Sequence, residues 1–153
     1  MTSDLSTAEL DRILDAVDLI EECLGRLVQT HKAVGREEYR TNPDTRAMVE
    51  RRFVKMTEAT LDIGTVLIVH EQGEAPESNP KTMQTLGHLD ILSDDLAAEM
   101  ADAARFRNVL AHTYGSSIDH DLVYNALGDL ERYRNFVISI RRYLETIGAL
   151  DSE

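Results

Sequence analysis

Apolar residues recur at the three- and four-residue spacing of an amphipathic helix in four long segments, and no segment alternates with the two-residue period of a strand. The first segment begins at "STAE", where Ser6 and Glu9 match a capping box, and it continues to near Lys32. Its apolar side chains step down one face: Leu10, Ile13, Val17, Ile20, Leu24 and Leu27. The pattern predicts a long first helix.

A second long helix is predicted after the polar stretch "AVGREEYRTNPD", which interrupts the periodicity. Asn42 is its expected N-cap, Pro43 lies in its first turn, and the pattern continues to about Val69. Its expected core residues are Val49, Phe53, Met56, Ile63 and Leu67. The stretch "HEQGEAPESNP" that follows is predicted to be a polar loop, too short to link two domains.

One short helix and two further long helices complete the pattern. "KTMQTLGHLDIL" predicts the short helix, and Ser93 followed by the acidic "DDLAAE" predicts the start of a long helix that ends near Gly115. The last helix is expected from about Asp119, with an apolar stripe of Val123, Leu127, Leu130, Val137, Ile140, Leu144 and Ile147. We therefore predict an all-α fold over residues 1–153, a single-domain up-and-down bundle of four long helices plus a short one.

Composition narrows the setting in which the protein works. A chain of 153 residues suits one hydrophobic core. Cys23 is the only cysteine, which excludes an intrachain disulfide and a cysteine-cluster metal site and makes a reducing cytoplasm the simplest location. The start "MTSDLSTAEL" does not match a secretory leader, and no run of about eighteen uncharged apolar residues occurs. We expect a cytoplasmic protein without a membrane segment.

The charge balance limits the surfaces that could meet nucleic acid. The 28 acidic and 16 basic residues give a net charge of −12, which repels nucleic acid at long range unless basic residues cluster. Arginine pairs in "ERRF" (50–53) and "ISIRRY" (138–143) are either solvated or ion-paired positions, or part of a track for phosphate groups. The acidic, lysine-poor composition fits equally a protein of high-salt surroundings and an ordinary acidic soluble protein.

The polar side chains of "RFRNVLAHTYG" (105–115) have the spacing Arg107-x4-His112-x-Tyr114, with Asn108 directly after the arginine. This spacing resembles the HEPN signature, an arginine followed by a polar residue and then, a few positions on, a histidine. The added tyrosine is similar to the narrower HepT form. The order of the predicted helices, with a long loop between the second and third, also resembles HepT-like proteins.

The resemblance implies an activity and a set of partners. HepT-like proteins are toxins of type VII-like HEPN/MNT toxin–antitoxin systems, which implies metal-independent RNA cleavage, with no cofactor, restrained by an MNT-type nucleotidyltransferase antitoxin. It also implies a homodimer whose two motifs line one cleft. In some pairs the antitoxin transfers AMP to the motif tyrosine, which by position is Tyr114 here.

The residue types suit RNA cleavage independently of the family resemblance. Metal-free RNA cleavage requires a group that moves a proton near neutral pH and a fixed cation where charge develops on the phosphate. Histidine suits the first role and arginine the second, which makes His112 and Arg107 the candidate catalytic residues. Asn108 could bind a phosphate or orient the histidine without adding charge, and we include it in the candidate site.

Helix geometry limits what one straight helix can do with these residues. Arg107 and Tyr114 are seven residues apart and share a face, whereas His112 points away from both. Either the helix ends or bends near His112, or a second chain completes the site. Both alternatives fit the HepT pattern.

Plainer interpretations of the same residues remain open at this point. His112 could be an ordinary histidine, Arg107 an ion-paired residue, and Tyr114 an aromatic contact at the helix end. The protein would then be a non-catalytic helical module that binds a nucleotide or a partner. The other histidines lack ligand spacing with one another, so no metal site is expected: His31, His70, His88 and His120.

Overall fold

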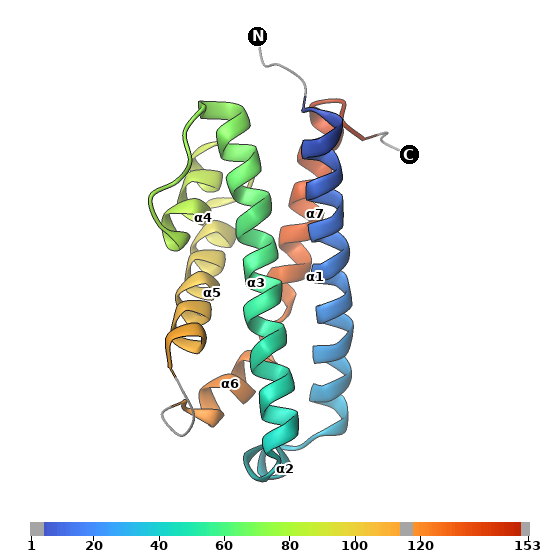
Figure 1. The fold of residues 1–153 in the computed structure, drawn as a ribbon, viewed down its shortest axis with the longest axis vertical. Helices are drawn as coiled ribbons and strands as arrows, with labels where there is room; N and C mark the ends of the chain where they lie inside the picture. Colours follow the sequence, from blue (N-terminus) through green and yellow to red (C-terminus); the bar gives the residue numbers. More distant parts are fainter. Residues whose placement is uncertain (1–4, 114–117, 151–153) are drawn as a thin grey trace.

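In a computed structural model, residues 5–113 and 118–150 are described, and within them all regular structure is helical. The helices are α1 (Thr7–Ala33), α2 (Arg36–Thr41), α3 (Pro43–Gln72), α4 (Asn79–His88), α5 (Asp94–His112), α6 (His120–Ala126) and α7 (Glu131–Thr146). Figure 1 shows the long helices α1, α3, α5 and α7 running up and down the long axis of the bundle. The all-α prediction is confirmed.

Side-chain caps begin three of the long helices, α1, α3 and α5, where the sequence predicts them. The Glu9 backbone N–H donates to Ser6 Oγ at 3.0 Å, and Glu9 Oε1 accepts from the Ser6 N–H at 2.8 Å, which completes the capping box of α1. Asn42 caps α3, with Pro43 as its first residue, and Ser93 caps α5. Each polar side chain satisfies a backbone donor that the helix itself leaves unpaired.

At two places the number of helices differs from the prediction. Residues 36–41, placed in a break of the pattern, form the short helix α2, which buries Tyr39 completely. The predicted last helix is two helices, α6 and α7, separated by residues 127–130. Leu127 and Leu130 are both buried in this interruption, so the apolar stripe continues although the helix does not. Hydrophobic periodicity alone therefore predicted one helix where the structure has two.

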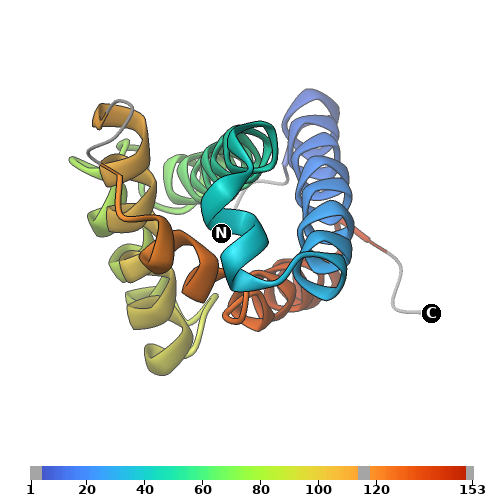
Figure 2. The same cartoon turned by 90° about the horizontal axis from the view of Figure 1, so that it is seen from below.

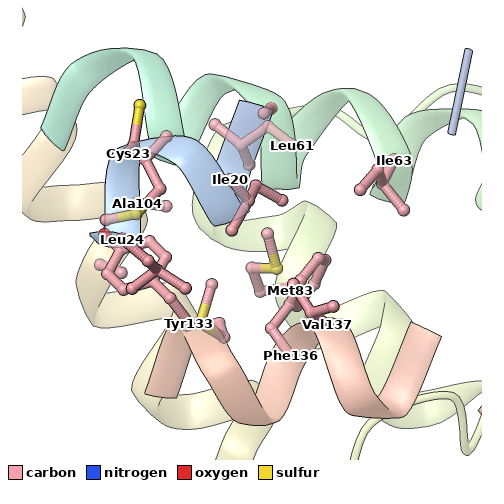
Figure 3. Close-up of a cluster of buried hydrophobic side chains, with 14 of the residues drawn as sticks. Ile20, Cys23, Leu24, Leu61, Ile63, Met83, Ala104, Tyr133, Phe136 and Val137 are labelled. Atoms are coloured by element: carbon pink, nitrogen blue, oxygen red, sulfur yellow. The ribbon is translucent and has the colours of Figure 1, made fainter. Parts of the chain in front are cut away.

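The hydrophobic core lies between the long helices. Figure 3 shows Ile20 and Leu24 of α1 with Tyr133 and Phe136 of α7 in one buried cluster, together with Met83 of α4. Tyr133 is the most polar of these side chains, and its hydroxyl lies 2.7 Å from Thr57 Oγ1 of α3, which is also buried. The hydrogen bond removes the cost of burying either hydroxyl unpaired.

The central helix α3 fixes where the other elements lie. Viewed from below, α3 separates α1 on one side from α4 and α5 on the other, and α2 crosses the lower end of the bundle (Figure 2). At Gly64 a Cβ atom would lie 2.7 Å from Thr82 Cγ2 of α4, so the glycine permits a close approach of the two helices. None of the helices in the described ranges is long and apolar enough to cross a membrane.

Candidate functional site

Arg107, on the last turns of α5, is held in an ion pair with α3. Its Nη2 lies 2.5 Å from Glu58 Oε1, and its Nη1 donates to Asn108 Oδ1 at 3.2 Å. The arginine side chain is 19% exposed and that of Glu58 is 49% exposed. The buried Nε of Arg107 has no hydrogen-bond partner among the described residues. The guanidinium is therefore fixed in direction, with its charge neutralised by one half-exposed carboxylate.

Asn108 connects the arginine to the start of α4. Its Oδ1 accepts one hydrogen bond from Arg107 and a second, at 3.0 Å, from Asn79 Nδ2. Asn79 is the first residue of α4. The residue that follows the motif arginine thus has its side-chain oxygen occupied by two donors, and it orients Arg107 within this chain.

His112 is the last residue of α5, and its side chain is exposed. It follows Arg107 by five residues, which on a regular helix places the two side chains about 140° apart. Asn108 precedes His112 by four residues and so shares its face of the helix. Among the described residues the structure brings together Arg107 and Asn108, and no ion pair or hydrogen bond joins the side chain of His112 to them.

The helix that carries the motif ends earlier than predicted. Thr113, with φ −112° and ψ 136°, is extended and caps α5 directly after His112. An end near His112 was one of the two alternatives left open by the helix geometry. Tyr114 and Gly115 lie outside the described residues.

Short helices fix the chain on the far side of the motif. Ile118 is buried, and α6 begins two residues later. Asp121 of α6 binds Arg36 Nη1 at 3.0 Å and Arg40 Nη2 at 2.8 Å, both from α2. Hydrogen bonds from Arg40 and Arg36 hold the pKa of the Asp121 carboxyl below its ordinary value. The chain from Ile118 to α6 is therefore anchored to the bundle.

Sequence reasoning missed the residues that hold the site. Glu58 and Asn79 lie 49 and 29 residues from their partners Arg107 and Asn108, so no local spacing indicates them. Asp121 lies 85 residues from Arg36. In the part of the chain with described coordinates, no group of three or more His, Cys, Asp or Glu residues is placed to hold a metal ion.

Known proteins resemble this chain in sequence and in fold. A "tRNA nuclease HepT" of Aphanizomenon flos-aquae is 27% identical over 130 residues, which are 82% of this chain and 88% of the relative. The structure of a tri-AMPylated HEPN toxin of Shewanella oneidensis in complex with MNT antitoxin superposes with a TM-score of 0.77 at 20% identity, over 86% of this chain and 98% of that one.

A third similarity covers an equally large part of the fold. The cytosolic protein of unknown function YutE from Bacillus subtilis superposes with a TM-score of 0.76 at 19% identity, over 89% of this chain and 90% of that one. At this identity the two structural matches show a shared fold. The model of the Ribonuclease HepT-like family matches residues 13–140, so the chain belongs to the Ribonuclease HepT-like family.

Proposed function

We propose that this protein is a metal-independent endoribonuclease and the toxin of a toxin–antitoxin pair, with His112 and Arg107 as its catalytic residues. The observation that carries the proposal is an oriented arginine and an exposed histidine at one helix end, in a chain of the Ribonuclease HepT-like family. The nuclease relative from A. flos-aquae supports RNA as the substrate.

The proposed reaction is attack of a ribose 2′-hydroxyl on the adjacent phosphate. The oxygen of the 2′-hydroxyl forms a bond to phosphorus, the bond to the 5′-oxygen of the next nucleotide breaks, and a cyclic phosphate results. His112 moves the proton lost by the 2′-hydroxyl to the departing 5′-oxygen, and Arg107 stabilises the charge that develops on the phosphate. Because Glu58 occupies Arg107 in the free protein, an incoming phosphate competes with this carboxylate for the guanidinium.

A homodimer would supply the geometry that a single helix lacks. Arg107 and His112 diverge on α5, and a two-fold interface would place the histidine of one copy near the arginine of the other. The proposed partner is an MNT-type nucleotidyltransferase antitoxin, which would transfer AMP to Tyr114 in the cytoplasm. The AMPylated S. oneidensis toxin in complex with its antitoxin, and the cytosolic B. subtilis protein of this fold, support these assignments.

The test is cleavage of RNA by His112→Ala with a matched control. His88→Ala removes another exposed histidine that is also the last residue of its helix. We expect the His112 variant to lose about 10²–10⁴-fold in rate and the His88 variant to keep the parent's rate, with cleavage unaffected by EDTA and products that carry cyclic or 3′-phosphate ends. Parent-like cleavage by folded His112→Ala would reject the assignment.

A second function is favoured by one observation. The Glu58–Arg107 ion pair is what a purely structural arginine would also show. The protein would then be a non-catalytic module that binds a nucleotide or partner through the motif. Unchanged affinity for the antitoxin in an Arg107→Ala variant that has lost cleavage would reject this module.

A further inference from the structure

Two basic side chains on α3 have no partner within the described chain. Arg51 and Lys55 are exposed, and neither belongs to any of the ion pairs found among residues 5–113 and 118–150. They are four residues apart, so they lie on neighbouring positions of one helix face. Arg26 of α1 and Arg142 of α7 are likewise exposed and outside these ion pairs, so what distinguishes Arg51 and Lys55 is their place relative to the motif.

The same face of α3 carries the carboxylate that binds the motif arginine. Glu58 follows Lys55 by three residues and Arg51 by seven, which places all three within about 60° around the helix axis. Glu58 is paired with Arg107, and Asp62, one turn further on, is paired with Arg12 at 3.8 Å. Two carboxylates of this face, those of Glu58 and Asp62, are thus already paired with arginines.

The antiparallel packing of α3 and α5 places these cations beside the motif. Figure 1 shows α3 and α5 running in opposite directions, and two contacts join them: Glu58 with Arg107, and Phe53 edge-on against Phe106 with centroids 5.3 Å apart. From Arg107 to His112 the α5 axis advances about 7.5 Å, and from Glu58 to Arg51 the α3 axis advances about 10.5 Å in the same direction. Measured from the Glu58–Arg107 pair, Lys55, about 4.5 Å along α3, therefore lies alongside the span between the two motif residues, and Arg51 lies about 3 Å beyond the level of His112.

We propose that Arg51 and Lys55 form a phosphate-binding subsite for the backbone of single-stranded RNA, next to the phosphate that is cleaved. The inference rests on the proposed ribonuclease function. It explains how a protein with a net negative charge could bind a negatively charged RNA strand. Contacts of this kind bind the sugar-phosphate chain without reading its sequence. The two arginines of "ERRF" then have different roles. Arg52 lies 3.7 Å from Glu22 of α1, whereas Arg51 has no ion-pair partner among the described residues and is available to a phosphate.

The test measures binding to a 2′-O-methyl RNA oligonucleotide, which has no 2′-hydroxyl to attack. The variant Arg51→Ala/Lys55→Ala is compared with Arg26→Ala/Arg142→Ala, which removes the same charge from exposed positions on α1 and α7 that form no ion pair among the described residues. By fluorescence anisotropy we expect the α3 variant to bind on the order of tenfold more weakly at 0.1 M salt. The slope of log affinity against log salt should fall by about 1.4, or about 0.7 per lost phosphate contact to a single strand.

The control should keep the parent's affinity and slope. Equal affinities and slopes for the two double variants, both folded by circular dichroism, would overturn the subsite. So would a loss of antitoxin binding by the α3 variant with its RNA affinity intact. This readout is independent of catalysis: RNA cleavage by His112→Ala at the parent's rate would reject the proposed reaction, whereas oligonucleotide binding tests only Arg51 and Lys55.

Discussion

Arg107 has its charge neutralised by Glu58, which predicts how a variant of Glu58 should act on RNA. Glu58 is 49% exposed, so Glu58→Gln should change stability by less than about 1 kcal/mol. Without the carboxylate, the guanidinium is free for a phosphate, and we expect a lower KM for RNA cleavage with little change in kcat. Steady-state kinetics together with thermal unfolding would measure both. A large fall in kcat would instead show that Glu58 holds Arg107 in its working position.

Asn108 allows a change of charge without a change of contacts. The substitution Asn108→Asp keeps an oxygen that accepts from Arg107 and Asn79, but it adds a negative charge about one hydrogen bond away from the guanidinium. We expect a raised KM for RNA and a parent-like circular dichroism spectrum, because the added carboxylate opposes phosphate binding at Arg107. A KM equal to that of the parent would argue against phosphate contact by this arginine.

The sequence predicts the types of the site residues and not their surroundings. Arg107, Asn108 and His112 are identifiable because they occur within six positions of one helix. Glu58 and Asn79 come from other helices, and their place depends on how α3 and α4 pack against α5. That packing is a tertiary property, which hydrophobic periodicity along one segment does not contain.

At the scale of elements, the contact of α6 with α2 predicts how stability depends on pH. The pKa of Asp121 is lower than its ordinary value of 3.8, so its interactions stabilise the fold above that value, and the contribution is lost as the pH falls through the lowered folded pKa. Asp121→Asn should therefore be less stable than the parent at pH 7, with a difference that shrinks below about pH 3.8. Urea unfolding at both pH values measures it.

The control for this prediction is Asp129→Asn, an exposed position that forms no ion pair within the described ranges. Its stability at pH 7 should differ little from that of the parent, because the substitution removes no ion pair. The same pH dependence in both variants would contradict the role given to Asp121.

Replacing a glycine by alanine should have opposite effects on stability at Gly64, where α3 packs closely on α4, and at Gly25, where a Cβ would have open space. Gly64→Ala would place a Cβ 2.7 Å from Thr82 Cγ2, which belongs to a residue only 2% exposed, so we expect a loss of about 1–3 kcal/mol of unfolding free energy. Gly25→Ala, in α1, meets nothing within 4 Å and should gain roughly 0.5–1 kcal/mol. Stabilisation of the Gly64 variant in chemical denaturation would show that α4 yields easily.

The helices themselves were predictable to different degrees. The starts of α1, α3 and α5 follow from local capping residues, which act within four positions of the chain. The division between α6 and α7 does not follow from the pattern, because Leu127 and Leu130 remain on the buried stripe. The six residues of α2 are too few for a periodic signal, and their helix depends on burying Tyr39.

For the whole molecule, the divergence of Arg107 and His112 on α5 predicts a symmetric dimer. Two copies related by a two-fold axis would bring the histidine of each near the arginine of the other, so activity should depend on association. Light scattering at micromolar concentration should give a mass near twice 17.2 kDa. A clean monomer that still cleaves RNA would contradict both the dimer and the shared site.

One uninterrupted helix, α3, carries Arg51, Phe53, Lys55 and Glu58. Insertions and deletions within this part of the sequence should therefore be poorly tolerated. Deleting or inserting a single codon between positions 51 and 58 would turn one part of the set about 100° relative to the other. Such a change would separate the contacts of Phe53 with Phe106 and of Glu58 with Arg107. The turn after Gly73 has no such constraint, so length differences among family members should gather in 73–78 and be absent from α3.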